Sequence, residues 1–204
     1  MVSQSKGEQT RQRAIARAAD TFSLYGYAGT SMSELRRVTG LKGGVYSHFE
    51  SKEALALEAF DYAISQLQQR AKDALVGKES AYLRLQALVN VFCSLIDEPF
   101  LPGGCPILNT AVEADDAYPV FRDRARGAMT LWHTRIYQIV AEGIQVGELH
   151  QETDPMVVAT ILTASLEGAI MLSKLYGDTS YMHRVVDHLT GYLKTLDLEE
   201  KSSA

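Results

Sequence analysis

Cysteine, proline and long apolar runs are scarce in this sequence of 204 residues. The two cysteines, Cys93 and Cys105, form neither a CxxC pair nor a disulfide framework, so a reducing cytoplasm is the simplest expected compartment. No run of 18 apolar residues is present and the first ten residues are polar, so we expect neither a transmembrane helix nor a secretory signal.

Sequence patterns of common enzyme classes are also missing. The chain has no HExxH, no Walker loop, no GxSxG and no Glu-x-x-His pair, and its histidines do not combine with acids in a metal-ligand pattern. His183 and Asp187 are four residues apart, a spacing that most often makes a surface hydrogen bond. We therefore predict that the protein is not an enzyme and has no catalytic residues, no metal site and no cofactor.

What the sequence does have is helical periodicity. Apolar residues recur at intervals of three and four, strand-like alternation is absent, and the 46% hydrophobic and 22% charged content suits a globular protein. We predict an all-α fold, with helices over residues 8–24, 31–38, 44–49, 51–75, 82–96, 106–113, 119–147, 154–177 and 182–196. The domains are expected at 1–52 and 76–204, with the fourth helix (52–75) as the connector.

Charge is distributed unevenly along the chain. Residues 1–52 contain eight Lys and Arg residues against four acids, a net charge of +4, whereas the whole chain has −5 and the remainder therefore −9. A basic N-terminal region on an acidic body is attracted to polyanions through one end only.

Two short helices separated by a glycine turn, within 31–49, predict a helix-turn-helix. The second helix of such a pair can enter the major groove of DNA, and the first can direct its N-terminal N–H groups at a phosphate. The expected contacts follow from position: hydroxyls at a helix start, glycines that permit close approach, donors on a short turn and a lysine opening the next helix. These residues are Thr30, Ser31, Gly43, Gly44, Tyr46, Ser47, His48 and Lys52.

The segment FSLYGYAGTSMSELRRVTGLKGGVYSHFESKEAL, residues 22–55, resembles the DNA-binding domain of the TetR family of bacterial transcriptional repressors. Matching pieces include Thr30-Ser31, Thr39-Gly40-Leu41, Tyr46, His48-Phe49 and the run from Ser51 to Leu55. Residues 103–116 (GGCPILNTAVEADD) also resemble a stretch found in one branch of that family.

The resemblance implies an N-terminal three-helix DNA-binding domain and a C-terminal helical domain for ligand binding and dimerisation. It implies a homodimeric repressor that binds a near-palindromic operator and is released by a small-molecule effector. It also adds Lys42 to the recognition region. One departure is that Gly40 to Tyr46 is one residue shorter than the family pattern, a difference that glycines in the turn can absorb.

Candidates for an effector pocket are aromatic and apolar residues of the C-terminal half, because such pockets are mostly apolar with a few polar groups. His133, Glu113 and Glu167 are candidate orienting groups, and Cys105 is a candidate redox or electrophile sensor. The full set is Phe92, Phe100, Cys105, Met129, Trp132, His133, Tyr137, Leu166 and Met171.

The last two helices carry small and apolar residues over too wide an arc for a single core-facing stripe, so we predict that they form the homodimer interface. Two alternatives remain open at this point. One is a redox-sensing regulator that uses Cys105, and the other is a helical protein-interaction adaptor that does not bind DNA.

Overall fold

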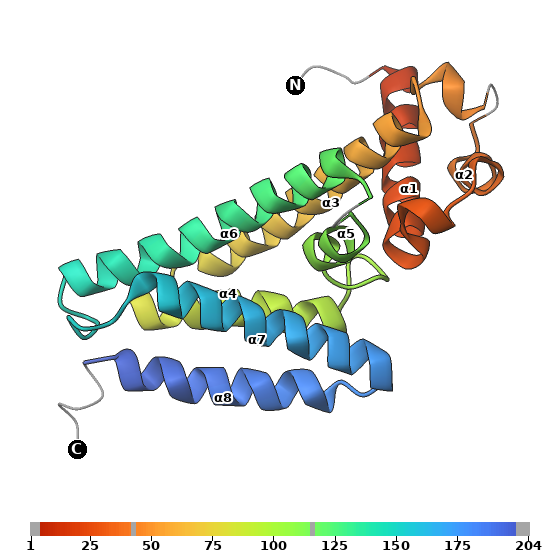
Figure 1. Cartoon of the computed structure of the whole chain (residues 1–204). Coiled ribbons are helices and arrows are strands. Elements are labelled where there is room, and N and C mark those ends of the chain that lie inside the picture. The colour runs from red at the N-terminus through yellow and green to blue at the C-terminus, as the bar shows by residue number, and fades with distance from the viewer. Residues whose placement is uncertain (1–4, 42–43, 115–116, 199–204) are drawn as a thin grey trace. The chain divides into compact units, whose positions relative to one another are not determined.

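Helices dominate the computed structural model, which describes residues 5–41, 44–114 and 117–198 (Figure 1). Within these ranges, an isolated antiparallel bridge between Leu149 and Asp197 is the only strand-like pairing. The prediction of an all-α fold is therefore confirmed. The elements are α1 (Lys6–Gly29), α2 (Met32–Thr39), the 3-10 helix η1 (Val45–Ser47), α3 (Lys52–Leu75), α4 (Ala81–Asp97), α5 (Pro106–Ala114), α6 (Pro119–Gln145), α7 (Pro155–Tyr176) and α8 (Ser180–Leu196).

Several helix ends lie where the sequence places them. Ser31 caps α2 by accepting the N–H of Glu34, and Asp154 caps α7 by accepting two N–H groups. Gly40 and Gly177 end α2 and α7 in the left-handed conformation, at φ 65° and 63°, which a residue without Cβ adopts at little cost. Local sequence therefore decides where these helices begin and end.

The short third helix differs from the prediction. The sequence predicts a helix over 44–49, whereas the structure has a three-residue 3-10 turn, η1. The N–H groups of Ser47 and His48 bond to carbonyls three residues earlier, on Gly44 and Val45. An α-helix needs bonds four residues apart, so this segment is wound more tightly than expected.

The structure divides into two compact units, and the first comprises Met1–Leu67 and Phe100–Ala125. The predicted domain limits at residues 52 and 76 do not coincide with this division, because Phe100–Ala125 belongs with the N-terminal helices. Leu101 is part of the same core as α1, α2, η1 and α3. The buried members of that core are Ala14, Ile15, Ala18, Ala19, Leu35, Leu41, Val45, Phe49, Leu55, Ala59, Ala63 and Leu101.

The second unit comprises Gln68–Pro99 and Arg126–Ala204. Here α4, α7 and α8 pack against one another. By length and composition α7 is apolar enough to cross a membrane, a test that core helices of other proteins also pass. The largest side chains that are fully buried in this unit include Leu85, Leu88, Phe92, Ile136, Ile139, Leu149, Leu162, Leu166, Ile170 and Met182.

Candidate DNA-binding site

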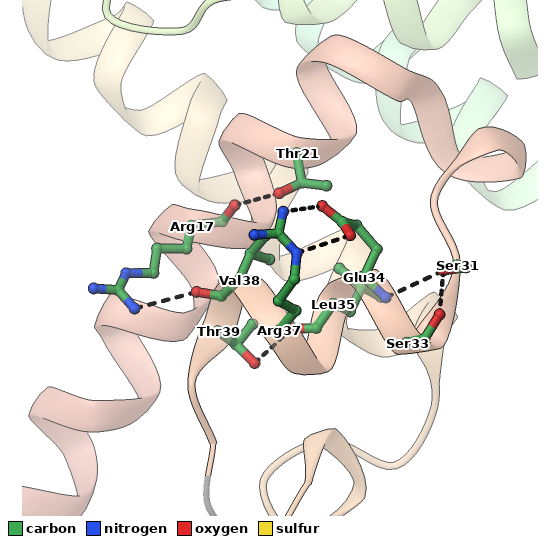
Figure 2. A network of polar contacts seen from close by, with 9 residues as sticks. All are labelled: Arg17, Thr21, Ser31, Ser33, Glu34, Leu35, Arg37, Val38 and Thr39. Atoms are coloured by element: carbon green, nitrogen blue, oxygen red, sulfur yellow. Dashed lines mark hydrogen bonds and ion pairs between the residues drawn. The ribbon is translucent and has the colours of Figure 1, made fainter.

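The N-terminus of α2 is exposed and capped. Ser31 accepts the N–H of Glu34 at 3.1 Å, and its oxygen lies 2.8 Å from the hydroxyl oxygen of Ser33 (Figure 2). The first N–H groups of a helix carry partial positive charge and point out of its end, where they attract phosphate. The position of Ser31 suits the phosphate contact that the sequence predicts.

The rest of α2 is fixed by bonds to itself and to α1. Arg37 donates to both carboxylate oxygens of Glu34, at 2.5 and 3.1 Å, and this hydrogen bonding lowers the pKa of Glu34 (Figure 2). Arg17 of α1 donates to the carbonyl of Val38 at 3.2 Å, and the buried Thr39 hydroxyl donates to Leu35 at 2.7 Å. The helix that would contact the DNA backbone is thus held in place before any DNA arrives.

Thr30 has a structural bond that the sequence did not suggest. Its side chain is 1% exposed, and its hydroxyl donates to the carbonyl of Gly26 at 2.6 Å. Gly26 has φ 70° inside α1, so Thr30 secures the chain just after a kink in that helix. A phosphate contact by this hydroxyl requires that bond to be released, whereas the exposed Ser31 needs no such change.

The η1 turn presents polar side chains to solvent. Tyr46 is 64% exposed, and Ser47 is exposed with its hydroxyl donating to the carbonyl of Gly44 at 2.7 Å. His48 is half-buried, with its ring 6.5 Å from that of Phe49. Val45 and Phe49 are buried and anchor the turn in the core. Of the predicted contact residues, Lys42 and Gly43 lie outside the described residues.

Lys52 opens α3, as predicted, but its ammonium group already has partners. Nζ donates to the carbonyl of Tyr27 at 2.5 Å and lies 4.3 Å from the centre of the Tyr27 ring. Partial burial lowers the pKa of Lys52, and the nearby Glu113 carboxylate opposes that shift. An ammonium group has three donors, so a phosphate contact by Lys52 stays a prediction.

Glu113 of α5 is the residue of this site that the sequence did not reveal. Its carboxylate accepts the N–H of Tyr27 at 2.8 Å and of Ala28 at 2.7 Å. The sequence suggested Glu113 as an effector-orienting group, and the structure places it instead at the kink of α1. A Cβ on Gly26 would lie 2.7 Å from this carboxylate, so the contact also requires glycine there. No pattern in the sequence pointed to this contact, because Glu113 and Tyr27 are 86 positions apart.

Comparison with known proteins decides what this arrangement belongs to. Residues 14–59 match the family described as "Bacterial regulatory proteins, tetR family", and residues 81–189 match "Tetracyclin repressor-like, C-terminal domain". The second match alone spans more than half of the chain. The chain belongs to the TetR family of transcriptional regulators. Members of the TetR family are DNA-binding, ligand-responsive regulators and not enzymes.

Individual TetR-family proteins resemble the chain over most of its length. A TetR transcriptional regulator from Chloroflexus aurantiacus J-10-FL is 40% identical with a TM-score of 0.91, over 94% of this chain and 98% of that one. The HTH-type transcriptional repressor DhaR of Mycobacterium sp. (strain GP1) is 28% identical over 167 residues, 81% of this chain and 82% of its own length. The TetR-family regulator CifR, solved as a cysteine mutant with 26-base-pair operator DNA, shares the fold at 24% identity and TM-score 0.76, over 88% and 94% of the chains.

In this TetR-family chain the effector-pocket candidates differ in burial and are divided between the two units. Phe92 and Trp132 are both buried in the second unit, with ring centres 4.8 Å apart, and Leu166 is buried in that unit as well. Tyr137 and Met171 are 41% and 53% exposed. Met129 and His133 are partly buried in the second unit, whereas Phe100 and Cys105 belong to the first.

Two buried polar atoms of the second unit lack a hydrogen-bond partner among the described residues. They are Nε1 of Trp132 on α6 and the hydroxyl oxygen of Thr163 on α7. A buried donor without a partner costs about 1–3 kcal/mol, so such groups call for an explanation. A bound molecule whose acceptor atoms meet these groups is one such explanation.

Neither cysteine has the surroundings of a reactive thiol. Cys105 has no exposed surface, which denies access to oxidants and electrophiles. Burial and a hydrogen bond to Asp97 raise the pKa of Cys93 to about 12, which keeps that thiol protonated at neutral pH. The geometry therefore gives no support to redox sensing through Cys105.

The α7 helix carries an apolar stripe that the second unit leaves uncovered. Met171 and Leu175 are 53% and 70% exposed, and Val157 and Ile161 are about half exposed. Spacings of four and three residues recur along this stripe, the period at which two helices pack along a seam. The stripe consists of Val157, Ile161, Ala164, Gly168, Met171 and Leu175.

Proposed function

We propose that this TetR-family regulator is a cytoplasmic homodimeric repressor that binds a near-palindromic operator and is released by a small-molecule effector. The observation that carries the proposal is the exposed η1 turn, with Tyr46 and Ser47 in solvent and Val45 and Phe49 in the core. Earlier in the chain, α2 begins at an N-terminus that Ser31 caps. The η1 turn thus offers hydrogen-bonding hydroxyls to base edges, and the N-terminus of α2 attracts phosphate.

The uncovered stripe of α7 supports homodimerisation. Contiguous exposed apolar side chains in a folded chain often mark interaction sites, and a closed dimer needs a surface that fits its own copy. Gly168 lies at the middle of the stripe with nothing within 4 Å of a Cβ built there. Small residues at that point allow two copies of α7 to approach closely. The α8 helix continues the same unit and is the second predicted interface helix.

The unpaired Trp132 and Thr163 groups support an effector site in the second unit. An effector that accepts a hydrogen bond from either group binds more tightly to the conformation in which that group is available. A ligand shifts a two-state equilibrium only through such a difference in affinity. Helix α6 is the covalent route for coupling, because it carries Trp132 in the second unit and begins at Pro119 in the first.

Selection from random DNA, followed by fluorescence anisotropy with the selected duplex, tests the proposal. Wild type should enrich a near-palindromic sequence. Tyr46→Ala should weaken its binding by about tenfold or more, since base contacts carry sequence discrimination. Tyr137→Ala, which removes an exposed tyrosine of the second unit, is the matched control and should bind as wild type does. An empty selection would favour the adaptor alternative, and unchanged affinity in Tyr46→Ala would refute the assigned contact.

Salt dependence tests the Lys52 contact separately. Lys52→Ala should reduce the slope of log affinity against log salt by about one, as expected for one lost phosphate contact. If the slope is unchanged while affinity falls, then Lys52 acts only by holding the Tyr27 carbonyl.

Sedimentation tests the dimer. Gly168→Glu places a charge in the middle of the α7 stripe and should convert the dimer to monomer. Gly127→Glu, also on a helix and with open space around it, is the control and should stay dimeric. A monomeric wild type would overturn the proposal.

A further inference from the structure

Three side chains that commonly bind metal ions meet between α4 and α8 of the second unit. They are Cys93, Asp97 and His183, and one ligand atom of each lies within 4.8 Å of the other two. The Cys93 sulfur is 3.2 Å from Oδ2 of Asp97, and Nε2 of His183 is 3.0 Å from the same oxygen. The sequence predicted no metal site, because His183 is 86 positions from Asp97 and 90 from Cys93.

The helical register supports a built site. Cys93 and Asp97 are four residues apart on α4, so they lie on the same face one turn apart. His183 and Asp187 have the same relation on α8, and the Asp187 carboxylate is among the charges that act on the Cys93 thiol. Helix α4 therefore contributes two ligand residues and α8 one, with the Asp187 charge acting on the same place.

Core packing holds the two helices in this register. Helix α8 packs on α4, and its residues Met182 and Leu189, which flank the ligand residues, are buried. His183 and Asp97 keep 51% and 39% of their side-chain surface exposed. The cluster is thus rigid at its base and open to solvent, which gives an ion a route of entry.

We propose that Cys93, Asp97 and His183 bind one divalent transition-metal ion, of which Zn²⁺ is the best-fitting type. Sulfur, imidazole nitrogen and carboxylate oxygen are the ligands that Zn²⁺ takes in tetrahedral sites, with bonds of about 2.0–2.3 Å and hence ligand–ligand separations of about 3.3–3.6 Å. The separations of 3.0 and 3.2 Å to Asp97 need only a small expansion, and the sulfur–imidazole separation, which lies within 4.8 Å, must settle in the same range. The fourth position faces solvent, where water or the Asp187 carboxylate completes the set.

Binding changes the protons in a defined way. Without metal, the Cys93 thiol donates to Asp97. His183 Nε2 also donates to the Asp97 carboxylate in that state. Metal binding replaces the S–H bond by a metal–sulfur bond and releases the thiol proton to solvent. Nε2 gives up its proton as well, which a neutral His183 exchanges through solvent for one on Nδ1 and a protonated His183 loses to solvent, so that Nε2 can coordinate. No electron transfer is involved. Magnesium and calcium are excluded as preferred ions, because they favour oxygen ligands only.

The competing interpretation is that the cluster is a hydrogen-bonded link between α4 and α8 and takes no ion. Titration of the full-length protein with Co²⁺, in a reductant that contains no thiol, distinguishes the two. The proposal expects one Co²⁺ per chain, with a sulfur-to-cobalt charge-transfer absorption and the visible bands of tetrahedral cobalt. Added Zn²⁺ should abolish both signals by displacement. A wild-type protein that gives no charge-transfer absorption would overturn the proposal.

Variants identify the ligands. Cys93→Ser should abolish the charge-transfer absorption, and His183→Gln should weaken Co²⁺ binding by more than about tenfold, since even indirect partners of metal ligands matter that much. His188→Gln, an exposed histidine on the same helix, is the matched control and should bind as wild type does. A charge-transfer absorption that survives Cys93→Ser would overturn the assignment.

Thermal unfolding is a second readout that needs no cobalt spectrum. Zn²⁺ should raise the midpoint of wild type and His188→Gln but not of His183→Gln, because only a ligand of the folded state stabilises it. An equal rise in all three proteins would show binding elsewhere and refute the site. Because the His183 side chain is about half exposed, His183→Gln is expected to fold even if Cys93→Ser does not.

Discussion

The two units of this protein treat their buried polar atoms differently. In the first, the buried hydroxyls of Thr30 and Thr39 donate to carbonyls at 2.6 and 2.7 Å. In the second, Thr163 and the indole of Trp132 are buried without a partner among the described residues. Satisfied buried groups stabilise the conformation in which they are paired. A unit with open donors gains stability when something binds, so the difference supports the proposal that the first unit contacts DNA and the second binds an effector.

The units also differ in what they expose. The first presents the hydroxyls of Tyr46 and Ser47 on η1, of which that of Ser47 already donates to Gly44 and can still accept. The second presents the apolar stripe of α7. Polar exposed groups suit a charged, hydrated partner such as DNA, whereas an apolar stripe suits the burial of surface against another protein.

The largest expected effect is a difference in the free energy of unfolding between a buried and an exposed aromatic substitution. Phe92→Ala removes a ring that is 1% exposed and packed on Trp132, and should lower the free energy of unfolding by about 3–5 kcal/mol. Tyr46→Ala, at an exposed position, should change it by no more than about 0.5 kcal/mol. Urea unfolding of both variants measures this contrast. Similar losses in the two would show that η1 is part of the core and would break the comparison.

The Glu113 contact is expected to have an intermediate effect. Glu113→Ala leaves the N–H groups of Tyr27 and Ala28 without their acceptor and should destabilise by about 1–3 kcal/mol. Glu142→Ala is the control, because it removes a surface partner of Arg84 and should cost about 0–1 kcal/mol. Unfolding by urea checks both. Equal costs would mean that the α1 kink does not depend on α5.

A matched pair of threonine substitutions tests the comparison most directly. Thr39→Val removes a satisfied buried hydroxyl and should destabilise by about 1 kcal/mol, because the partner carbonyl of Leu35 loses a donor. Thr163→Val removes an unsatisfied one and should be neutral or stabilise by about 1 kcal/mol. Thermal and urea unfolding give the two signs. Destabilisation by both substitutions would contradict the distinction between the units.

The smallest effect concerns acid pH. Hydrogen bonding by Arg37 lowers the pKa of Glu34, so the folded state binds this proton less readily than the unfolded state does. The pair therefore stabilises the fold above the unfolded pKa of about 4.3, and that contribution is lost as pH falls through the lower folded value. Arg37→Ala should raise the pKa of Glu34, and an NMR titration of the side-chain carboxyl measures that pKa. Arg36→Ala, at the neighbouring exposed arginine, should leave it lowered.

The sequence predicted features that depend on neighbouring residues. The helix ends at Gly40 and Gly177 and the caps at Ser31 and Asp154 follow from backbone freedom and from side chains that reach N–H groups two or three residues away. A short helical element after Gly40 was also expected, and the structure has one there, although it is a 3-10 turn and not the predicted helix. The winding of so short a segment depends on how Val45 and Phe49 enter the core, which periodicity does not report.

The tertiary structure alone decided the contacts between distant segments. It placed Glu113 at the backbone of Tyr27, although these residues are 86 positions apart, and it brought Cys93 and Asp97 to His183. It also left Trp132 buried without a partner. The amino-acid order by itself determined an all-helical TetR-family chain with a basic DNA-contacting end, because helix periodicity, caps and charge are local properties. Which carboxylate, thiol or indole meets which partner depends on how helices pack, and packing is set by the sum of many weak contacts that no local pattern encodes.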